Sequence, residues 1–296
     1  MRSFLNSLFS LLILFLIVIS SFVIATTIVI SSCFVRIIPV KSWHQKMRQK
    51  LTVFAQWWAS FNNLLIRSRR CEWDIKNNVP LSTEHWYVLI ANHRTWFDIL
   101  VLGYVFNRKI PLLKFFMKRE LLWALPIVGL ACWVLDYPFM RRHSRKAIRL
   151  NPVLKTQDIE TAKKACQKFL ISPTTVMNFV EGTRFTPEKH KRQLSPFKHL
   201  LKPKAAGMAV VINELHPKLS GILNVTIHYS DPNMSFWKFF QKGCQKITVF
   251  YELLPVTSDL IGDYYEDRKF RVYFQQWLNT LWEKKDLLLD ELDRSS

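Results

Sequence analysis

A long apolar run at the amino terminus is the strongest constraint on what this chain can fold into. Residues 3–35 contain no charged side chain, no glycine and no proline. As one helix the run would measure about 50 Å, whereas the hydrocarbon core of a bilayer is about 30 Å thick. A secretory signal peptide would have a shorter apolar core and a small-residue cleavage site. We therefore expect residues 1–40 to be a retained membrane anchor.

Basic residues gather on one side of this anchor. Only Arg2 and the amino terminus precede it, whereas a cluster of basic residues follows it: Arg36, Lys41, Lys46, Arg48 and Lys50. An excess of lysine and arginine marks the cytoplasmic side of a membrane segment, so we expect the residues from 41 onward to be cytoplasmic. A single span is favoured over a two-helix hairpin because the run has no glycine or proline at which to turn.

The segment after the anchor predicts an amphipathic helix. Its apolar residues recur at steps of three and four and form one helical face that includes tryptophan: Trp43, Met47, Leu51, Phe54, Trp58, Phe61 and Leu65. Basic residues decorate the same helix, a composition typical of helices that lie in the lipid headgroup layer. We therefore predict an interfacial helix over residues 41–72. The alternative is an ordinary amphipathic helix that packs on the rest of the protein.

The charge balance of the chain indicates an anionic partner. There are 42 lysines and arginines against 22 acidic residues, a formal net charge of +20. Nucleic acid and lipid head groups both carry the required charge. No nucleic-acid motif is recognisable and the basic residues are dispersed, so we expect membrane lipids as partners and no nucleic acid. The five cysteines form no Cys-x-x-Cys pair and have no histidines at metal spacing, which predicts free thiols and no metal site.

From about residue 72 onward the pattern predicts one α/β domain, residues 73–296. Short β-type runs alternate there with helical stretches, the arrangement of a mixed sheet flanked by helices. The expected strands are 86–91, 133–137, 174–180, 222–229 and 246–254, and the expected helices include 95–106, 158–170, 204–215 and 268–290.

Two further segments of this domain need an interpretation. The apolar run 121–135 is too short to span a bilayer comfortably, so we interpret it as core or as membrane-facing surface. The basic run 141–156 is interpreted as an exposed connection, with binding of an acidic substrate or carrier as the alternative.

Two polar motifs follow two of the expected strands. Residues 92–98 (NHRTWFD) begin where the strand 86–91 ends, and residues 181–184 (EGTR) begin where the strand 174–180 ends. Folds of the α/β class place their reactive groups beyond the carboxyl ends of the strands. We therefore expect a base, its orienting acid and an anion-binding arginine to meet at this edge of the sheet.

The two motifs and the blocks between them resemble the glycerolipid acyltransferase family, whose members transfer a fatty acyl group to glycerol 3-phosphate or lysophosphatidate. The chain keeps the family's order of a lysine-bearing segment (118–121), a Pro-x-x-Gly turn (126–129) and an aromatic segment that ends in arginine (138–141). The resemblance covers roughly residues 85–230 and is nearest to a bacterial inner-membrane acyltransferase.

This resemblance implies a glycerol-3-phosphate acyltransferase-like fold and a lysophospholipid acceptor. The implied donor is a thioester of coenzyme A or of acyl carrier protein, with no other cofactor. Within the family's motifs, Lys118, Arg141 and Thr183 are implied to bind the substrate. Ordinary surface charge is the alternative for Lys118 and Arg141.

His93 is the candidate general base. Imidazole titrates near the operating pH, which suits it to remove a proton from a hydroxyl whose oxygen attacks a thioester carbonyl. Asp98 is the candidate partner that fixes the imidazole tautomer and stabilises the imidazolium. On an unbroken helix the two residues would lie about 140° apart, so they can meet only if His93 precedes the helix. A loop histidine without a chemical role is the alternative for His93, and Thr95-x-x-Asp98 is also a capping-box pattern.

The second motif offers an anion-binding site. Gly182 lets the backbone approach a substrate closely, and the planar fork of Arg184 matches phosphate oxygens. We expect Glu181 to shape the turn or to bond the glycerol of the acceptor, because its charge would oppose a phosphate. Asn92 or backbone amides are the expected donors to an oxyanion. The chain has no G-x-S-x-G elbow, so direct transfer is expected rather than an acyl-serine intermediate.

These expectations describe a membrane-bound enzyme that converts 1-acyl-sn-glycerol 3-phosphate to phosphatidic acid at the cytoplasmic face of a bacterial inner membrane. Two enzymatic alternatives are the remodelling of another lysophospholipid and the acylation of glycerol 3-phosphate itself. A third alternative is a non-enzymatic, membrane-tethered protein whose basic surface binds nucleic acid or anionic lipid.

Overall fold

A mixed six-stranded sheet organises the domain in the computed structural model, which describes residues 2–37, 40–77, 79–140 and 153–295. The strand order is β1-β8-β7-β2-β6-β3, and only the pairing of β7 with β8 is antiparallel. The strands are β1 (Glu72–Lys76), β2 (Trp86–Ala91), β3 (Leu113–Phe115), β6 (Thr175–Asn178), β7 (Leu219–Tyr229) and β8 (Lys246–Leu254). The expected mixed α/β architecture is therefore confirmed.

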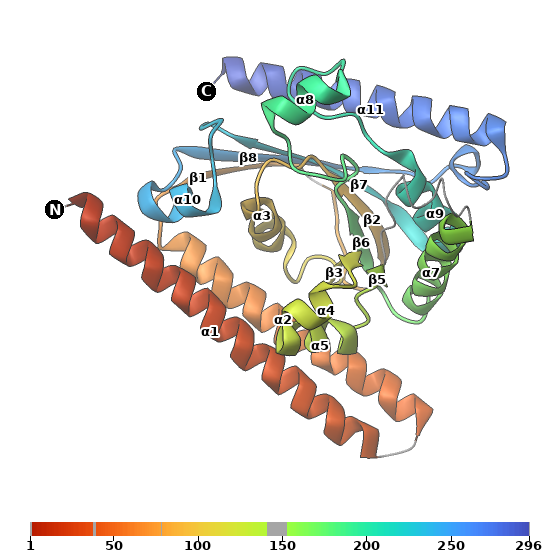
Figure 1. Ribbon diagram of the computed structural model, residues 1–296, viewed down its shortest axis with the longest axis horizontal. Helices are drawn as coiled ribbons and strands as arrows, with labels where there is room; N and C mark the ends of the chain where they lie inside the picture. The colour runs from red at the N-terminus through yellow and green to blue at the C-terminus, as the bar shows by residue number, and fades with distance from the viewer. Residues whose placement is uncertain (1, 38–39, 78, 141–152, 296) are drawn as a thin grey trace.

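Helices cover both faces of this sheet (Figure 1). On one face, α3 (Phe97–Phe106) and α10 (Phe236–Lys242) lie between the sheet and the long helices α1 (Arg2–Ile37) and α2 (Lys41–Arg67). The other face is covered by α7 (Val153–Phe169), α9 (Ala205–Leu215) and α11 (Arg268–Arg294). A strand that is covered on both faces reads as a continuous apolar run, as β2 (WYVLIA) does. Each face therefore has its own apolar core.

Smaller elements complete the domain. A separate two-stranded parallel sheet joins β4 (Met117–Lys118) to β5 (Phe139–Met140). The remaining helices are α4 (Leu121–Ala124), α5 (Pro126–Val134), α8 (Pro187–Gln193) and the 3-10 helix η1 (Ser258–Leu260). The basic run 141–156 lies mostly outside the described residues, so its interpretation as an exposed connection stays a prediction.

One expected strand is wrong. Residues 133–137 do not pair with the sheet, because the apolar run that begins at Pro126 continues as α5 as far as Val134. Proline suits the first turn of a helix. The buried residues Ala131 and Leu135 then face Ala25 and Ile28 of α1 rather than a neighbouring strand. The short edge strands β1 (EWDIK) and β3 (LKF) were not expected from the sequence, although their polar and apolar residues alternate.

The amino-terminal run forms a single unbroken helix, α1, which is long and apolar enough to cross a membrane. Its inner flank packs along the domain. Ser7 Oγ accepts a hydrogen bond from Gln241 of α10 at 3.2 Å, Ile13 belongs to the core beside α3, and Ile28 packs near α5. Its outer flank exposes large apolar side chains, among them Phe4, Leu8, Leu11, Phe15, Phe22, Ile30 and Phe34.

The predicted apolar face of α2 packs largely within the protein. Leu51 and Leu65 are buried, and Trp58 Nε1 donates to Ser21 Oγ of α1 at 3.0 Å. The exposed apolar residues of this helix, such as Trp57 and Leu64, lie on another side. This geometry supports the alternative of a helix packed on the domain, and the location of α2 in the headgroup layer stays a prediction.

Candidate active site

The two motifs meet at one edge of the sheet. β2 and β6 are parallel neighbours in register, with Ile90 opposite Asn178, so the segments that follow them emerge side by side. The His93 amide donates to Glu181 Oε1 at 2.9 Å, and the Phe185 amide donates to the His93 carbonyl at 2.7 Å. The expected meeting of the motifs is therefore found in the structure.

His93 lies in the turn between β2 and α3, as its pairing with Asp98 requires. Its Nδ1 is 2.8 Å from Asp98 Oδ2, and α3 begins only at Phe97. Asp98 is an acceptor when ionised, so Nδ1 carries the proton in this pair and Nε2 keeps its lone pair. Nε2 has no hydrogen-bond partner among the described residues. The ring is therefore oriented by protein on one side and open to a substrate on the other.

Asp98 also organises the start of α3. Besides the imidazole, its Oδ2 accepts from the backbone amides of Arg94 at 2.7 Å and Thr95 at 3.0 Å. Thr95 Oγ1 accepts from the Phe97 amide at 3.3 Å. Capping of the helix and orientation of the histidine thus coexist in one carboxylate, which is fully buried.

Two aromatic residues for which the sequence predicted no role complete the surroundings of His93. Tyr229, at the carboxyl end of β7, donates to Asp98 Oδ1 at 2.6 Å. The ring of Phe179 stacks on the imidazole at 3.8 Å and 8° between planes. A buried tyrosine hydroxyl needs a hydrogen-bond partner, and this requirement is the only sequence-level signal that could have identified Tyr229.

The carboxylate of Glu181 binds backbone amides and is not exposed to solvent. Its side chain is fully buried, and its two oxygens accept from the amides of His93 and Leu201, each at 2.9 Å. Burial raises the pKa of this carboxyl to about 7, against the lowering effect of those two amides. Of the two roles expected for Glu181, the geometry supports the shaping of the turn and offers no exposed oxygen to an acceptor.

Asn92 has a similar structural task. Its Nδ2 donates to the Ile227 carbonyl at 2.9 Å and its Oδ1 accepts from the Ile227 amide at 2.8 Å. The side chain therefore joins the end of β2 to β7, behind His93. This clamp is the observed role of Asn92, and backbone amides are the better candidates for the oxyanion donors.

The rest of the second motif forms an exposed cationic loop. Gly182 has φ 70°, and a Cβ there would lie 2.8 Å from Lys204 Nζ, so glycine suits the turn sterically. Lys189 Nζ donates to Thr183 Oγ1 at 2.8 Å and to the Arg184 carbonyl at 3.0 Å. The Arg184 guanidinium lies 4.7 Å from the ring centre of Trp96. Arg184 and Trp96 thereby bring the two motifs together at the surface.

The other two expected cations are less closely tied to this loop. Lys118 is exposed in β4, which belongs to the two-stranded sheet rather than the main one. Arg141 lies outside the described residues. Their roles as substrate ligands stay predictions.

An apolar cavity of about 290 Å³ lies between α3, the α1–α2 pair and α5. Ile99 and Gly103 of α3 line it, together with Met117, Ala59 and Ala131. Ile99 directly follows Asp98 in α3, so the helix that carries Asp98 also contributes one wall of this cavity. The cavity is thus suited to an apolar chain close to the reactive group.

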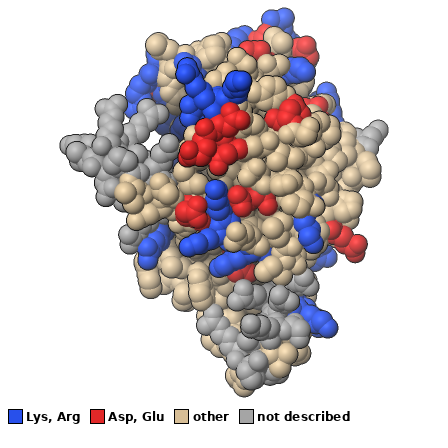
Figure 2. Space-filling model, turned by 90° about the vertical axis from the view of Figure 1, so that its right-hand side faces the viewer, with Lys and Arg blue, Asp and Glu red and all other residues tan. Residues whose placement is uncertain are grey.

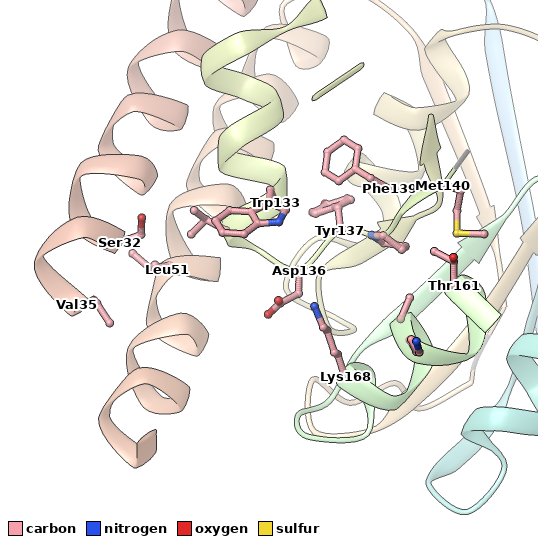
Figure 3. A pocket seen from close by; sticks show the side chains of 14 residues that line it. Ser32, Val35, Leu51, Trp133, Asp136, Tyr137, Phe139, Met140, Thr161 and Lys168 are labelled. Carbon is pink, nitrogen blue, oxygen red and sulfur yellow. The ribbon is translucent and has the colours of Figure 1, made fainter. Parts of the chain in front are cut away.

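A second, more polar cavity of about 600 Å³ lies between α7, β5 and the ends of α1 and α5 (Figure 3). Asp136 and Lys168 point toward one another across it, and Trp133 forms part of its apolar wall. Figure 2 shows the neighbouring face of the molecule, where basic and acidic side chains are mixed rather than sorted into one cationic stripe.

Comparison with known proteins identifies relatives of this chain. The family model described as Acyltransferase matches residues 72–229. The 1-acyl-sn-glycerol-3-phosphate acyltransferase 3 of Arabidopsis thaliana is 28% identical over 232 residues, which cover 71% of this chain and 56% of that protein. The 1-acyl-sn-glycerol-3-phosphate acyltransferase gamma of Mus musculus is 23% identical over 253 residues, which cover 81% and 60%. The chain thus spans less than two thirds of the length of these curated relatives.

A solved structure supports the same architecture. The crystal structure of PlsC, the 1-acyl-sn-glycerophosphate acyltransferase of Thermotoga maritima, aligns with a TM-score of 0.51 over 99% of both chains. The two sequences are 15% identical. At that identity the likeness concerns the fold alone.

Proposed function

This chain belongs to the Acyltransferase family, and on that premise we propose that it is an O-acyltransferase that acylates 1-acyl-sn-glycerol 3-phosphate. The observation that carries the proposal is the His93–Asp98 pair, whose free Nε2 lies at the carboxyl edge of the sheet. The apolar cavity lined by Ile99 and Gly103 of α3, the helix that also carries Asp98, supports a substrate with a long acyl chain. The donor is an acyl thioester of coenzyme A or of acyl carrier protein, and no further cofactor is proposed.

The proposed reaction is a direct transfer between two bound substrates. His93 Nε2 removes the proton of the acceptor hydroxyl while its oxygen forms a bond to the thioester carbonyl carbon. The carbonyl oxygen becomes an oxyanion, which backbone amides stabilise. The carbon–sulfur bond then breaks, the sulfur leaves as the thiol after it receives the proton from the imidazolium, and an ester remains. Asp98 stabilises the imidazolium between these two proton transfers.

The acceptor phosphate is assigned to the exposed cationic loop. Arg184 carries a fork of donors that matches phosphate oxygens, and its stacking on Trp96 limits the orientations of that fork. Lys118, in β4, and Arg141 are proposed to add positive charge for the substrate, and Thr183, which accepts from Lys189, is proposed to bind it as well.

Arg184→Lys is expected to raise the apparent KM for the phosphorylated acceptor far more than the KM for the donor, because lysine keeps the charge but loses the bidentate fork. A charge-assisted hydrogen bond contributes about 1.5 to 3 kcal/mol, so acceptor kcat/KM should fall roughly tenfold to a hundredfold. Initial rates with each substrate varied in turn measure this. Arg192→Lys, on the exposed helix α8, should leave both constants unchanged. A raised donor constant with unchanged acceptor kinetics would assign Arg184 to the thioester instead.

The apolar cavity is proposed to hold the acyl chain of the donor, and Gly103 offers a direct test. A Cβ at this position meets no atom within 4 Å, so a larger side chain would project into open space without a steric clash. Gly103→Leu is expected to lower the rate with the longest acyl thioesters roughly tenfold to a hundredfold relative to short ones, because the cavity loses length for several methylenes. Gly103→Ala should leave the preference nearly unchanged. Equal losses across all chain lengths, measured by competition between thioesters, would exclude this cavity as the acyl site.

A membrane location is supported by the outer flank of α1. The helices α2, α4 and α5 also expose tryptophan side chains, namely Trp57, Trp123 and Trp133. Because the domain packs along most of α1, we propose that this flank attaches the enzyme along the membrane surface. The residues from 41 onward, with their basic excess, are proposed to lie on the cytoplasmic face of a bacterial inner membrane.

Identification of the acceptor requires one experiment. Membranes carrying the protein receive a single labelled acyl thioester and a panel of acceptors: 1-acyl-sn-glycerol 3-phosphate, other lysophospholipids and glycerol 3-phosphate. Product from the first acceptor above all others supports the proposal. Preference for another lysophospholipid would indicate remodelling, and absence of transfer to every acceptor would contradict acyl transfer altogether.

A further inference from the structure

Lys285 is a charged side chain buried inside the protein, on α11 and far along the chain from both motifs. Only 2% of its surface is exposed. Its Nζ donates to the Val225 carbonyl at 2.5 Å and to Thr226 Oγ1 at 3.3 Å, and it lies 4.9 Å from the ring centre of Trp282. A buried ammonium loses its hydration and needs a compensating negative charge. No step of the proposed transfer uses this group, so its burial requires another explanation.

Glu181 supplies part of the compensating charge. Lys285 and Glu181 attract each other electrostatically, and each favours the charged form of the other. Glu252 of β8 is the second carboxylate that acts on Lys285, and it accepts from Asn224 Nδ2 at 2.7 Å. Arg94 is the other cation that acts on Glu181. The buried charge of α11 is thereby coupled to the carboxylate that binds the His93 amide.

We propose that Lys285 is a positioning residue for the active site, because it is buried against β7 beside the end of β2 and acts together with Glu181 to fix the backbone of His93. An ionised carboxylate can accept from the amides of His93 and Leu201 at once, whereas a protonated one loses part of that capacity. Lys285 also acts through β7, where Val225 is the register partner of Ala91, two residues before His93. It holds Val225 in β7, two residues before Ile227, which binds Asn92. This inference rests on the proposed acyl transfer and adds a residue to its machinery.

The charge states of the pair fit this role near neutral pH. Burial raises the pKa of Glu181 to about 7 and lowers the pKa of Lys285 to about 7, and their mutual attraction opposes both changes. Removal of Lys285 would therefore raise the pKa of Glu181 further. Because the proposed role requires ionised Glu181, the rate is highest well above the pKa of Glu181 and falls as the pH is lowered through that pKa. Without Lys285, the acidic limb of the pH–rate profile should move to higher pH.

The test compares Lys285→Met, Glu181→Gln and the double variant in kcat and KM across the pH range in which each protein stays folded. Lys285→Met is expected to lower kcat at pH 7 on the order of tenfold, to move the acidic limb to higher pH and to change KM little. In the Glu181→Gln background, Lys285→Met should not move the acidic limb further and should add little to the loss of kcat, because no ionisable group remains at position 181. If Lys285→Met does not fold, Lys285→Gln replaces it in this test, because glutamine keeps a hydrogen-bond donor for the Val225 carbonyl.

Leu289→Ala is the matched control. Leu289 is buried one helical turn further along α11, so this change weakens the packing of the same helix without touching the charge pair. It should lower thermal stability and leave the pH–rate profile in place. An unchanged profile in both Lys285 variants, or losses that multiply in the double variant, would overturn the role of Lys285.

A second readout separates this proposal from the proposed function. The carboxyl carbon of Glu181 is titrated by NMR in the wild type and in the Lys285 variants. Titration at higher pH in the variants supports the pair even if no acceptor is ever acylated. The same titration pH in all proteins overturns the pair, whereas absence of transfer by the wild type overturns only the acyltransferase assignment.

Discussion

His93→Ala is expected to abolish acyl transfer while the fold and the membrane association are retained. His93 Nε2 is the only group proposed to remove the hydroxyl proton, and loss of a general base alone usually lowers the rate by about 10² to 10⁴-fold. The imidazole side chain is 11% exposed and stacks on Phe179, so its removal leaves a small gap at the surface of the site. Steady-state transfer of a labelled acyl group, together with thermal unfolding and membrane sedimentation, measures these outcomes.

His85 provides the control for this experiment. It is exposed and precedes β2, whereas His93 follows the opposite end of the same strand. His85→Ala should retain most of the activity, because it lies away from the carboxyl edge of the sheet. A well-folded His93→Ala protein that also retained most of its activity would contradict the mechanism. It would then favour a membrane-tethered binding protein over an enzyme.

The central strands of the sheet could be predicted from the sequence because the pattern of apolar residues determines where they begin and end. β2 and β8 have the bounds expected for them, since covered strands appear as short apolar runs between polar segments. The motifs after β2 and β6 could be expected to meet because parallel neighbours place their carboxyl ends at one edge. Local pattern thus predicted His93, Asp98 and Glu181 as one cluster.

The pattern of apolar residues predicted the wrong element where the secondary structure depends on the length of the run and on tertiary contacts. The run 121–135 is apolar throughout, so its period distinguishes poorly between a strand and a buried helix. Packing against α1 selects the helix α5, and this contact joins segments about one hundred residues apart. The face of α2 was predicted to be apolar, but the sequence could not identify α1 and α3 as the surfaces that cover it.

The residues that support the site could not be predicted from the local sequence pattern, because their contacts join distant parts of the chain. Tyr229 reaches Asp98 only through the register of β7 with β2, at a separation of 131 residues. Lys285 did leave a signal in the sequence. It follows Leu281 and Trp282 and precedes Leu289 at helical spacing, so it occupies the buried face of α11. A lysine on an otherwise apolar helical face indicates a buried partner, and here the partners are Val225 and Glu181.

Asp98→Asn is expected to be nearly as severe as loss of the base, with a fall in kcat on the order of 10³ to 10⁴-fold. The four donors to Asp98 are the imidazole, two backbone amides and the Tyr229 hydroxyl. An asparagine of the same size can accept at one oxygen only, and its amide group would face a donor at the other position. His93 then loses the acceptor that fixes its tautomer, and the imidazolium loses its counter-charge. The start of α3 also loses bonds, so thermal stability should fall with the rate.

Tyr229→Phe separates these two effects. It removes the single donor to Oδ1 and leaves Oδ2, with its bonds to His93, Arg94 and Thr95, in place. Loss of one hydrogen bond to an ionised group costs about 1.5 to 3 kcal/mol, so its stability should fall and its rate by roughly a hundredfold at most. If Asp98→Asn slowed transfer no more than Tyr229→Phe does, the carboxylate would matter as a helix cap and not as the partner of the base. A rate loss in Asp98→Asn that persists at temperatures where it is fully folded assigns the charge of Asp98 to the chemical step.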